Sequence, residues 1–436
     1  MDSKPFLTVL LAAGSTLDLG LPVPDANTAL HRMPSTDEIT QAVLTLDGPL
    51  ALLRGTAYFH DGRHSQSGRP PFEIARTVSV LKILERALKA EFDNVDFELV
   101  LHALEQLETY ARAGCHLDMH DPFRPVLSAF TRFAGRYRLL ANPELLTAAR
   151  QAVIQSIVGL ILERKQQCGT LIPSGKLTHF LKTIGDRFSL RVFTLNYDDL
   201  ADEAVPHAFD GFEGTVDDGG RTDLRAFCPG AFARRYWEEP VVLVHLHGSV
   251  RFGYSLQSTQ DELVRYDQPC EALKSLQGMM VSDKISYGSI VSAAPIISGL
   301  HKAAKLVQNP VPYGHYFRAL MDSLVQTPRL LVVGYGGRDD HVNAWLSQFA
   351  RIHNTGRRVV WISKLGGDTV GQRLPEKDLL RELTGPANWQ EYKAWCGAED
   401  GDFQTHGAWL RLVASGFPPA NDSVVNRITE FLMPQK

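Results

Sequence analysis

Polar residues follow two apolar, strand-like runs about fifty positions apart, and this pattern constrains the fold more than any other feature of the chain. The first run leads into Asn196, Tyr197 and Asp198. The second, residues 241–244, leads into the block around His247. In an open parallel sheet, ligands bind outside the carboxyl ends of the strands. An amide, a carboxylate and an imidazole delivered to that edge predict a reaction centre.

A third strand-like run, residues 6–11, enters a turn of small residues, 12–22, which we call the first glycine turn. Small side chains let backbone N–H groups approach a phosphate, and the N-terminus of a following helix favours negative charge. Because the turn lacks the full G-x-G-x-x-G pattern, a purely structural turn is the alternative. The residues expected to touch a nucleotide here are Ala13, Gly14, Ser15, Thr16 and Pro22.

A fourth run, residues 329–333, enters the second glycine turn, residues 334–340. Glycine permits positive φ and close backbone approach. An acidic or amide side chain after such a turn, Asp339 or Asn343, could bond a ribose hydroxyl. The alternative is that Asp339 or Asp340 caps the helix that follows. The residues expected to contact the ligand from this turn are Gly334, Tyr335, Gly336 and Asp339.

Buried apolar runs separated by helical patterns are typical of α/β proteins with a parallel sheet. Residues 71–169 differ, because they show helical apolar stripes without a strand; we call them the helical block. The sequence therefore predicts a Rossmann-like parallel sheet, built from residues 1–70 and 170–436, with the helical block inserted as a subdomain.

Two further regions carry weaker patterns. Residues 206–232 are rich in Gly and Asp without periodicity, which predicts a long surface loop. The C-terminal tail has amphipathic stretches near residues 405–414 and 423–433, which we interpret as helices available for assembly.

Composition limits the partners. The 436 residues carry a net charge of −4, which gives no overall attraction to nucleic acid or to an anionic membrane. The five cysteines are scattered and form no CxxC pair, as expected of reduced thiols in a cytoplasm. The apolar run at residues 6–11 is too short to span a membrane and lacks a signal-peptide layout, so we expect a cytoplasmic protein.

Metal binding is not expected from the sequence. If the strand continued to His247, His245 and His247 would share a face, but no carboxylate or cysteine follows at ligand spacing. A second cluster is better explained as a solvated loop; its members are His116, Asp118, His120 and Asp121.

The order of these motifs resembles that of sirtuin-like (Sir2-like) NAD-consuming domains. AAGSTLDLGLP, TLNYDDL, HLHGS and GYGGRDDHVNAWL follow one another along the chain, and the last is similar to a segment of bacterial sirtuin-like proteins in antiphage defence. Ala12 stands where the family's first turn has a glycine, and Leu195 where it has a glutamine. The paired zinc cysteines of protein-deacylating sirtuins are missing, so the resemblance is to a zinc-free branch.

This resemblance implies an NAD⁺ hydrolase with NAD as its substrate and no zinc. Asn196 would orient the ribose and a water, Asp198 would hold the carboxamide, and His247 would accept a ribose hydroxyl proton. It further implies a gated effector that depletes NAD in antiphage defence, as a homo-oligomer or with a companion ATPase or nucleotide-processing enzyme. The alternatives are an NAD or ADP-ribose sensor without turnover, and a sirtuin-like ADP-ribosyltransferase or deacylase.

Overall fold

The computed structural model describes most of the chain, and all structural statements below refer to these residues. They are 4–17, 33–45, 74–115, 142–168, 174–216, 222–255, 263–281, 295–299, 302–308, 310–363, 404–406, 409–413, 416–417, 419 and 422–433.

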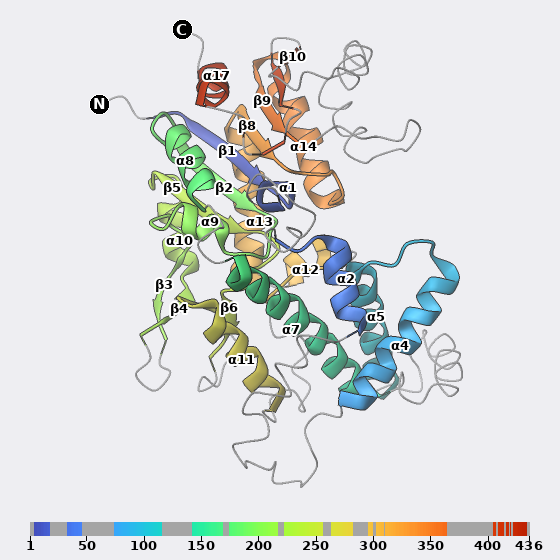
Figure 1. Ribbon diagram of the computed structural model, residues 1–436. Helices are drawn as coiled ribbons and strands as arrows, with labels where there is room; N and C mark the ends of the chain where they lie inside the picture. Colours follow the sequence, from blue (N-terminus) through green and yellow to red (C-terminus); the bar gives the residue numbers. More distant parts are fainter. Residues whose placement is uncertain are drawn as a thin grey trace, which may run out of the picture.

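The main sheet has seven strands in the order β10-β11-β9-β8-β1-β2-β5 (Figure 1). All run parallel except β10, which pairs antiparallel with β11. Taken in chain order, the six parallel strands are arranged 3-2-1-4-5-6, which is the Rossmann order, and the predicted fold class is confirmed. The strands are β1 (Phe6–Leu11), β2 (Ser189–Thr194), β5 (Val241–His245), β8 (Arg329–Val333), β9 (Arg358–Ile362), β10 (Gln404–His406) and β11 (Leu410–Val413).

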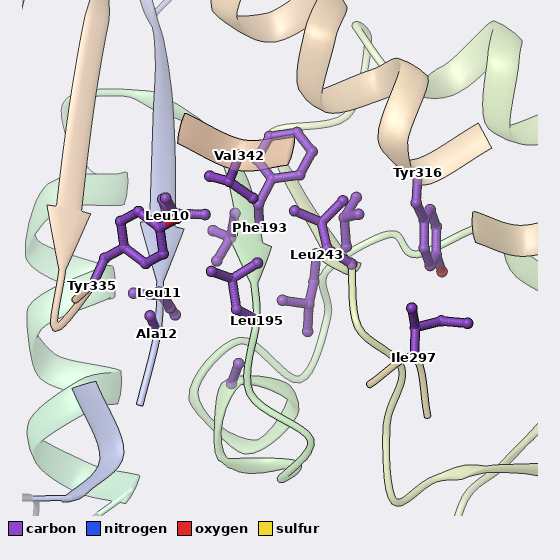
Figure 2. Close-up of a cluster of buried hydrophobic side chains, with 14 of the residues drawn as sticks. Leu10, Leu11, Ala12, Phe193, Leu195, Leu243, Ile297, Tyr316, Tyr335 and Val342 are labelled. Carbon is purple, nitrogen blue, oxygen red and sulfur yellow. The ribbon is translucent and has the colours of Figure 1, made fainter. Parts of the chain in front are cut away.

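The strands are continuous apolar runs because both faces of the sheet are covered. Figure 2 shows part of this core, with Leu10 on β1, Phe193 on β2 and Leu243 on β5. In register, Leu11 lies opposite both Thr194 and Val333. Strands β1, β2 and β8 therefore end level with one another, at the same edge of the sheet.

Helices connect and cover these strands. Helix α17 contacts both β9 and α8, and α13 packs on α14. The elements are α1 (Gly14–Leu17), α8 (Ser174–Gly185), α9 (Leu200–Ala204), α10 (Pro229–Arg235), α12 (Lys302–Gln308), η5 (Pro310–Gly314), α13 (His315–Gln326), α14 (Asp340–His353), η6 (Asn354–Gly356) and α17 (Asp422–Leu432).

Three long helices of the helical block, α4 (Ile74–Glu91), α5 (Phe97–Cys115) and α7 (Pro143–Cys168), pack on one another and on α2 (Thr36–Thr45). In Figure 1 they lie on the side of the molecule toward which β1 runs. Helix α7 is long and apolar enough to cross a membrane, but 72% of its apolar window is buried inside the protein. Its composition is therefore that of a core helix.

A second, antiparallel sheet has the order β3-β4-β7-β6. Strands β3 (Phe212–Thr215) and β4 (Leu224–Phe227) lie where the sequence predicted a long surface loop, so that prediction was wrong for these segments. Each strand is four residues long, too short for periodicity to reveal, and the buried rings of Phe212 and Phe227 hold the pair. The other elements of this region are β6 (Phe252–Tyr254), β7 (Leu263–Tyr266) and α11 (Pro269–Val281), which packs on α7.

The tail also differs from expectation. The stretch near residues 405–414 contributes β10 and β11 to the edge of the main sheet instead of a helix. The stretch near 423–433 is helical, as α17, but its apolar face is buried against the sheet and α8.

Candidate active site

The candidate site lies where the chain leaves β1 for α1 and leaves β8 for α14. Strand β1 is central: β2 and β5 lie on one side of it, and β8 and β9 on the other. The strand order reverses at this point, which is where doubly wound folds form their ligand crevice. Both predicted glycine turns lie at this switch point.

The two glycine turns pack directly against each other. The Gly14 N–H donates to the Gly334 carbonyl at 3.0 Å. A Cβ at Gly14 would lie 2.7 Å from the Gly334 Cα, so no larger residue fits this approach. Gly334 has a φ of +68°, which a side chain would strain. Glycine is thus needed here for packing between the turns, whatever ligand they bind.

The predicted contact residues of the two glycine turns differ in how far they are buried. Ala13 and Gly336 are exposed, whereas the Ser15 and Tyr335 side chains are buried. The Ser15 side chain and its backbone N–H both donate to the Ala12 carbonyl, so Ser15 stabilises the turn. Ala12, which replaces the family's glycine, is 5% exposed and packs in the core, where its methyl group is accommodated (Figure 2). Pro22 lies outside the described residues.

Asn196 is tied to the first glycine turn. Its Nδ2 donates to the Ala12 carbonyl at 3.2 Å, to Ser15 Oγ at 3.2 Å and to Thr16 Oγ1 at 3.3 Å. The side chain is buried at the end of β2. These bonds hold the start of α1 in place, so Asn196 links the first strand end to the second.

Asp198 lies beside Asn196 and shares one partner with it. Its Oδ1 accepts the Leu200 N–H at 3.1 Å, and Thr16 donates a second hydrogen bond. Burial raises the pKa of Asp198 to about 6, although both hydrogen bonds favour the carboxylate. With a pKa near neutrality, the carboxyl group can accept a hydrogen bond from a carboxamide N–H when it is ionised and donate one to the carboxamide oxygen when it is protonated.

His247 is buried just beyond the end of β5, with 2% of its surface exposed. It hydrogen bonds the backbone of Leu195, next to Asn196. Its Nε2 lies 3.2 Å from His341 Nε2 and 3.8 Å from an Asp339 carboxylate oxygen. Burial, aided by the nearby Lys302 ammonium, lowers the pKa of His247 well below its usual value. The imidazole is therefore neutral at pH 7 and suited to accept a proton.

His245 does not join His247. Strand β5 ends at His245, and the positive φ of Gly248 lies in the turn that follows. The His245 Nε2 lies 3.0 Å from an Asp202 carboxylate oxygen, and Arg265 pairs with the same carboxylate. The two histidines thus have different partners.

The second glycine turn is held by its own side chains. Tyr335 donates to Asn343 Oδ1 at 2.7 Å, and the Asp339 N–H donates to the tyrosine hydroxyl. Asp339 is the residue before α14, but its carboxylate makes no capping hydrogen bond. It pairs instead with Lys302, at 2.6 Å. Asp339 occupies the N-cap position while its charge points toward His247.

Sequence patterns missed three groups of this site: His341, Lys302 and Glu98. Lys302 lies between Asp339 and Glu98, at 2.6 and 2.9 Å, and so joins the second glycine turn to helix α5. His341 follows Asp339 by two positions and lies 94 positions from the residue that it contacts. In the sequence, only the position of His341 two residues after Asp339 could have drawn attention to it. The ion pairs of Lys302 with Asp339 and Glu98 join residues far apart in the sequence and form only through tertiary packing.

Comparison with known proteins is consistent with this geometry. Residues 190–382 match the family model described as SIR2-like domain. The matched range contains Asn196, Asp198, His247 and the second glycine turn, whereas the first glycine turn and the helical block precede it. No curated protein matches the chain. The family match and the site together point to a function that involves NAD, and the chain contains a SIR2-like domain.

Proposed function

We propose that the protein is an NAD⁺ glycohydrolase, which cleaves NAD⁺ to nicotinamide and ADP-ribose. One observation carries the proposal: Asn196, Asp198 and His247 come together at the switch-point edge. Thr16 bonds both Asn196 and Asp198, and His247 bonds the backbone residue preceding Asn196. The two glycine turns adjoin this cluster at the switch point, where doubly wound folds bind a dinucleotide.

The chemistry suits these groups. The bond between ribose C1′ and the pyridinium nitrogen breaks, its electron pair neutralises the ring, and water adds to the oxocarbenium-like carbon. In our proposal Asn196 orients the ribose and the water, and Asp198 holds the carboxamide. Neutral His247 accepts a ribose hydroxyl proton. The alkoxide formed takes a proton from the water that adds to the carbon, and His247 releases its own proton to solvent, so one H⁺ is produced per NAD⁺ cleaved. Removing such a proton-transfer group typically slows a reaction about 10²–10⁴-fold.

Two alternatives remain as outcomes of the test. A sensor would bind NAD or ADP-ribose without turnover, but it would have no need of a neutral imidazole beside the strand ends. A deacylase or ADP-ribosyltransferase would require an acceptor. The sequence lacks the paired cysteines of the zinc module found in deacylating sirtuins, which favours hydrolysis.

The cellular role that we propose is a gated effector in bacterial antiphage defence, acting in the cytoplasm by NAD depletion. Unchecked NAD loss would kill the cell, so the activity must be controlled. The helical block, which we propose is an inserted subdomain, touches the site through Glu98 and Lys302. It is therefore a suitable place for a companion defence protein or a second copy of the chain to act.

The deciding experiment incubates the purified full chain with NAD⁺, with and without an acetylated peptide, and separates the products. ADP-ribose formed without the peptide supports hydrolysis. Stable, bound NAD⁺ supports the sensor, and acyl-ADP-ribose supports deacylation. His247→Ala should abolish NAD⁺ loss, and so should Asn196→Ala, while His207→Ala changes an exposed histidine and should not. Turnover by folded His247→Ala at the wild-type rate would refute the assignment.

A further inference from the structure

Three ligand atoms converge beside the strand ends in a way that the proposed hydrolysis does not require. They belong to His247, Asp339 and His341, and all lie within 4.8 Å of one another. His247 comes from the turn after β5, and the other two from the start of α14. Within the described part of the chain, no other trio of His, Cys, Asp or Glu side chains meets this condition.

The spacing fits coordination of a single ion. Zinc binds histidine nitrogen at roughly 2.0–2.1 Å, so two ligands of a tetrahedral ion lie about 3.4 Å apart. The Nε2 atoms of His247 and His341 are 3.2 Å apart, and Asp339 Oδ1 is 3.8 Å from the first. Three protein ligands leave a fourth position for water or substrate, as in other open zinc sites.

The donors are also in the form that a metal needs. Burial disfavours the charged form of both imidazoles, and their Nε2 atoms face each other at 3.2 Å, where two protonated rings would repel. Burial alone would raise the pKa of Asp339, but the Lys302 ammonium at 2.6 Å keeps that pKa low, so the side chain is a carboxylate. Two imidazoles and one carboxylate favour Zn²⁺ over Mg²⁺, which prefers oxygen ligands.

Lys302 is the main competitor of an ion at this position. Its ammonium lies 2.6 Å from the Asp339 oxygen that faces His247. It also has a second acceptor, Glu98, at 2.9 Å, and can keep that partner when Asp339 turns to a metal. A nearby positive charge weakens the binding of a cation without removing the ligands, so Lys302 would set the affinity of the site.

We propose that His247, Asp339 and His341 form a divalent transition-metal site that takes Zn²⁺. This site differs from the cysteine module of deacylating sirtuins, because its ligands surround the histidine of the reaction centre. Zinc on His247 Nε2 occupies the lone pair that would accept a proton, so bound zinc inhibits the enzyme reversibly. The inhibition rests on the proposed function, whereas the binding does not.

The test measures zinc bound to the full chain by competition with a chelating indicator dye. Wild type should hold one more Zn²⁺ per chain than His341→Ala or Asp339→Asn. All these proteins keep the same cysteines, so the difference isolates the proposed site. His207→Ala should match wild type, and excess Mg²⁺ should not displace the zinc. Circular dichroism would check the folding of each variant.

Lys302→Met sharpens the test, because it removes the competing charge and leaves all three ligands. It should bind zinc roughly ten-fold or more tightly than wild type, because the substitution removes the repulsion between the Lys302 ammonium and a zinc ion a few ångströms away in a partly buried site. Equal zinc binding by wild type, His341→Ala and Asp339→Asn would overturn the proposal. Zinc binding without NAD⁺ hydrolysis would leave the site standing and remove only the inhibition.

Discussion

The contact between the two glycine turns predicts a large difference between substitutions at two neighbouring positions. Alanine at Gly334 would place its Cβ 2.3 Å from the carbonyl carbon of Gly14 and the nitrogen of Ser15, at a φ of +68°. Alanine at Gly336 would meet no heavy atom within 4 Å. Both substitutions restrict the unfolded chain equally, so the difference between the stabilities of the two variants comes from the native state.

The magnitude follows from two costs. An L-residue in the left-handed region costs about 1–2 kcal/mol. Forcing a methyl group against backbone costs about 1–3 kcal/mol more. The lower entropy of the unfolded chain returns about 0.4–1 kcal/mol in either variant. The entropy gain cancels between the two variants, so Gly334→Ala should be about 2–5 kcal/mol less stable than Gly336→Ala, which should lie within about 1 kcal/mol of wild type.

Hydrogen exchange read by mass spectrometry suits this comparison, because a chain of this size is not expected to unfold in one step. Peptides covering residues 6–17 and 329–340 contain both turns. The Gly14 amide, which donates to the Gly334 carbonyl, should exchange about 30- to 4,000-fold faster in Gly334→Ala than in Gly336→Ala. Indistinguishable exchange in the two variants would refute the reasoning that the turns are packed to contact.

Three further predictions concern buried polar groups. Burial raises the pKa of Asp198 from 3.8 to about 6, so the wild type loses stability as pH rises from about 4 through about 6. Over that interval Asp198→Asn should gain about 1–3 kcal/mol relative to wild type, measured by hydrogen exchange of peptides around residue 198. A difference that does not change with pH would contradict this. Asp202→Asn removes a buried carboxylate from the partly buried Arg265 and should cost about 3–5 kcal/mol, measured as a lower melting temperature. An unchanged melting temperature would contradict this. Tyr335→Phe removes the donor to Asn343 and should cost about 1–2 kcal/mol in local exchange around the second glycine turn, with α17 as an internal reference that should not change.

The sequence was most informative where the chain obeys a local rule. Long apolar runs identified the strands β1, β2, β5 and β8, and polar residues directly after them drew attention to Asn196, Asp198 and His247, which the structure brings to one edge. Rossmann topology then brings such residues to one edge without further information. The glycine turns were found for a related reason, since only glycine permits their close approach.

Local rules failed where partners are distant or elements are short. The four-residue strands β3 and β4 have no measurable period, and their stability comes from aromatic packing across the sheet. The strands of the tail looked like an amphipathic helix, because alternation over so few residues does not distinguish the two. Lys302 and Glu98 meet only after the helical block has docked.

Lys302 couples the helical block thermodynamically to the candidate active site. Its ammonium is shared between Glu98 on α5 and Asp339 beside His247, so α5 cannot move away without changing the charge balance around that imidazole. Coupling of this kind is reciprocal. A ligand that binds at the strand ends and interacts with Asp339 changes the free energy of α5 docking. Docking of α5 changes the free energy of ligand binding by the same amount. The state of the site can therefore be read from the position of a helix outside it.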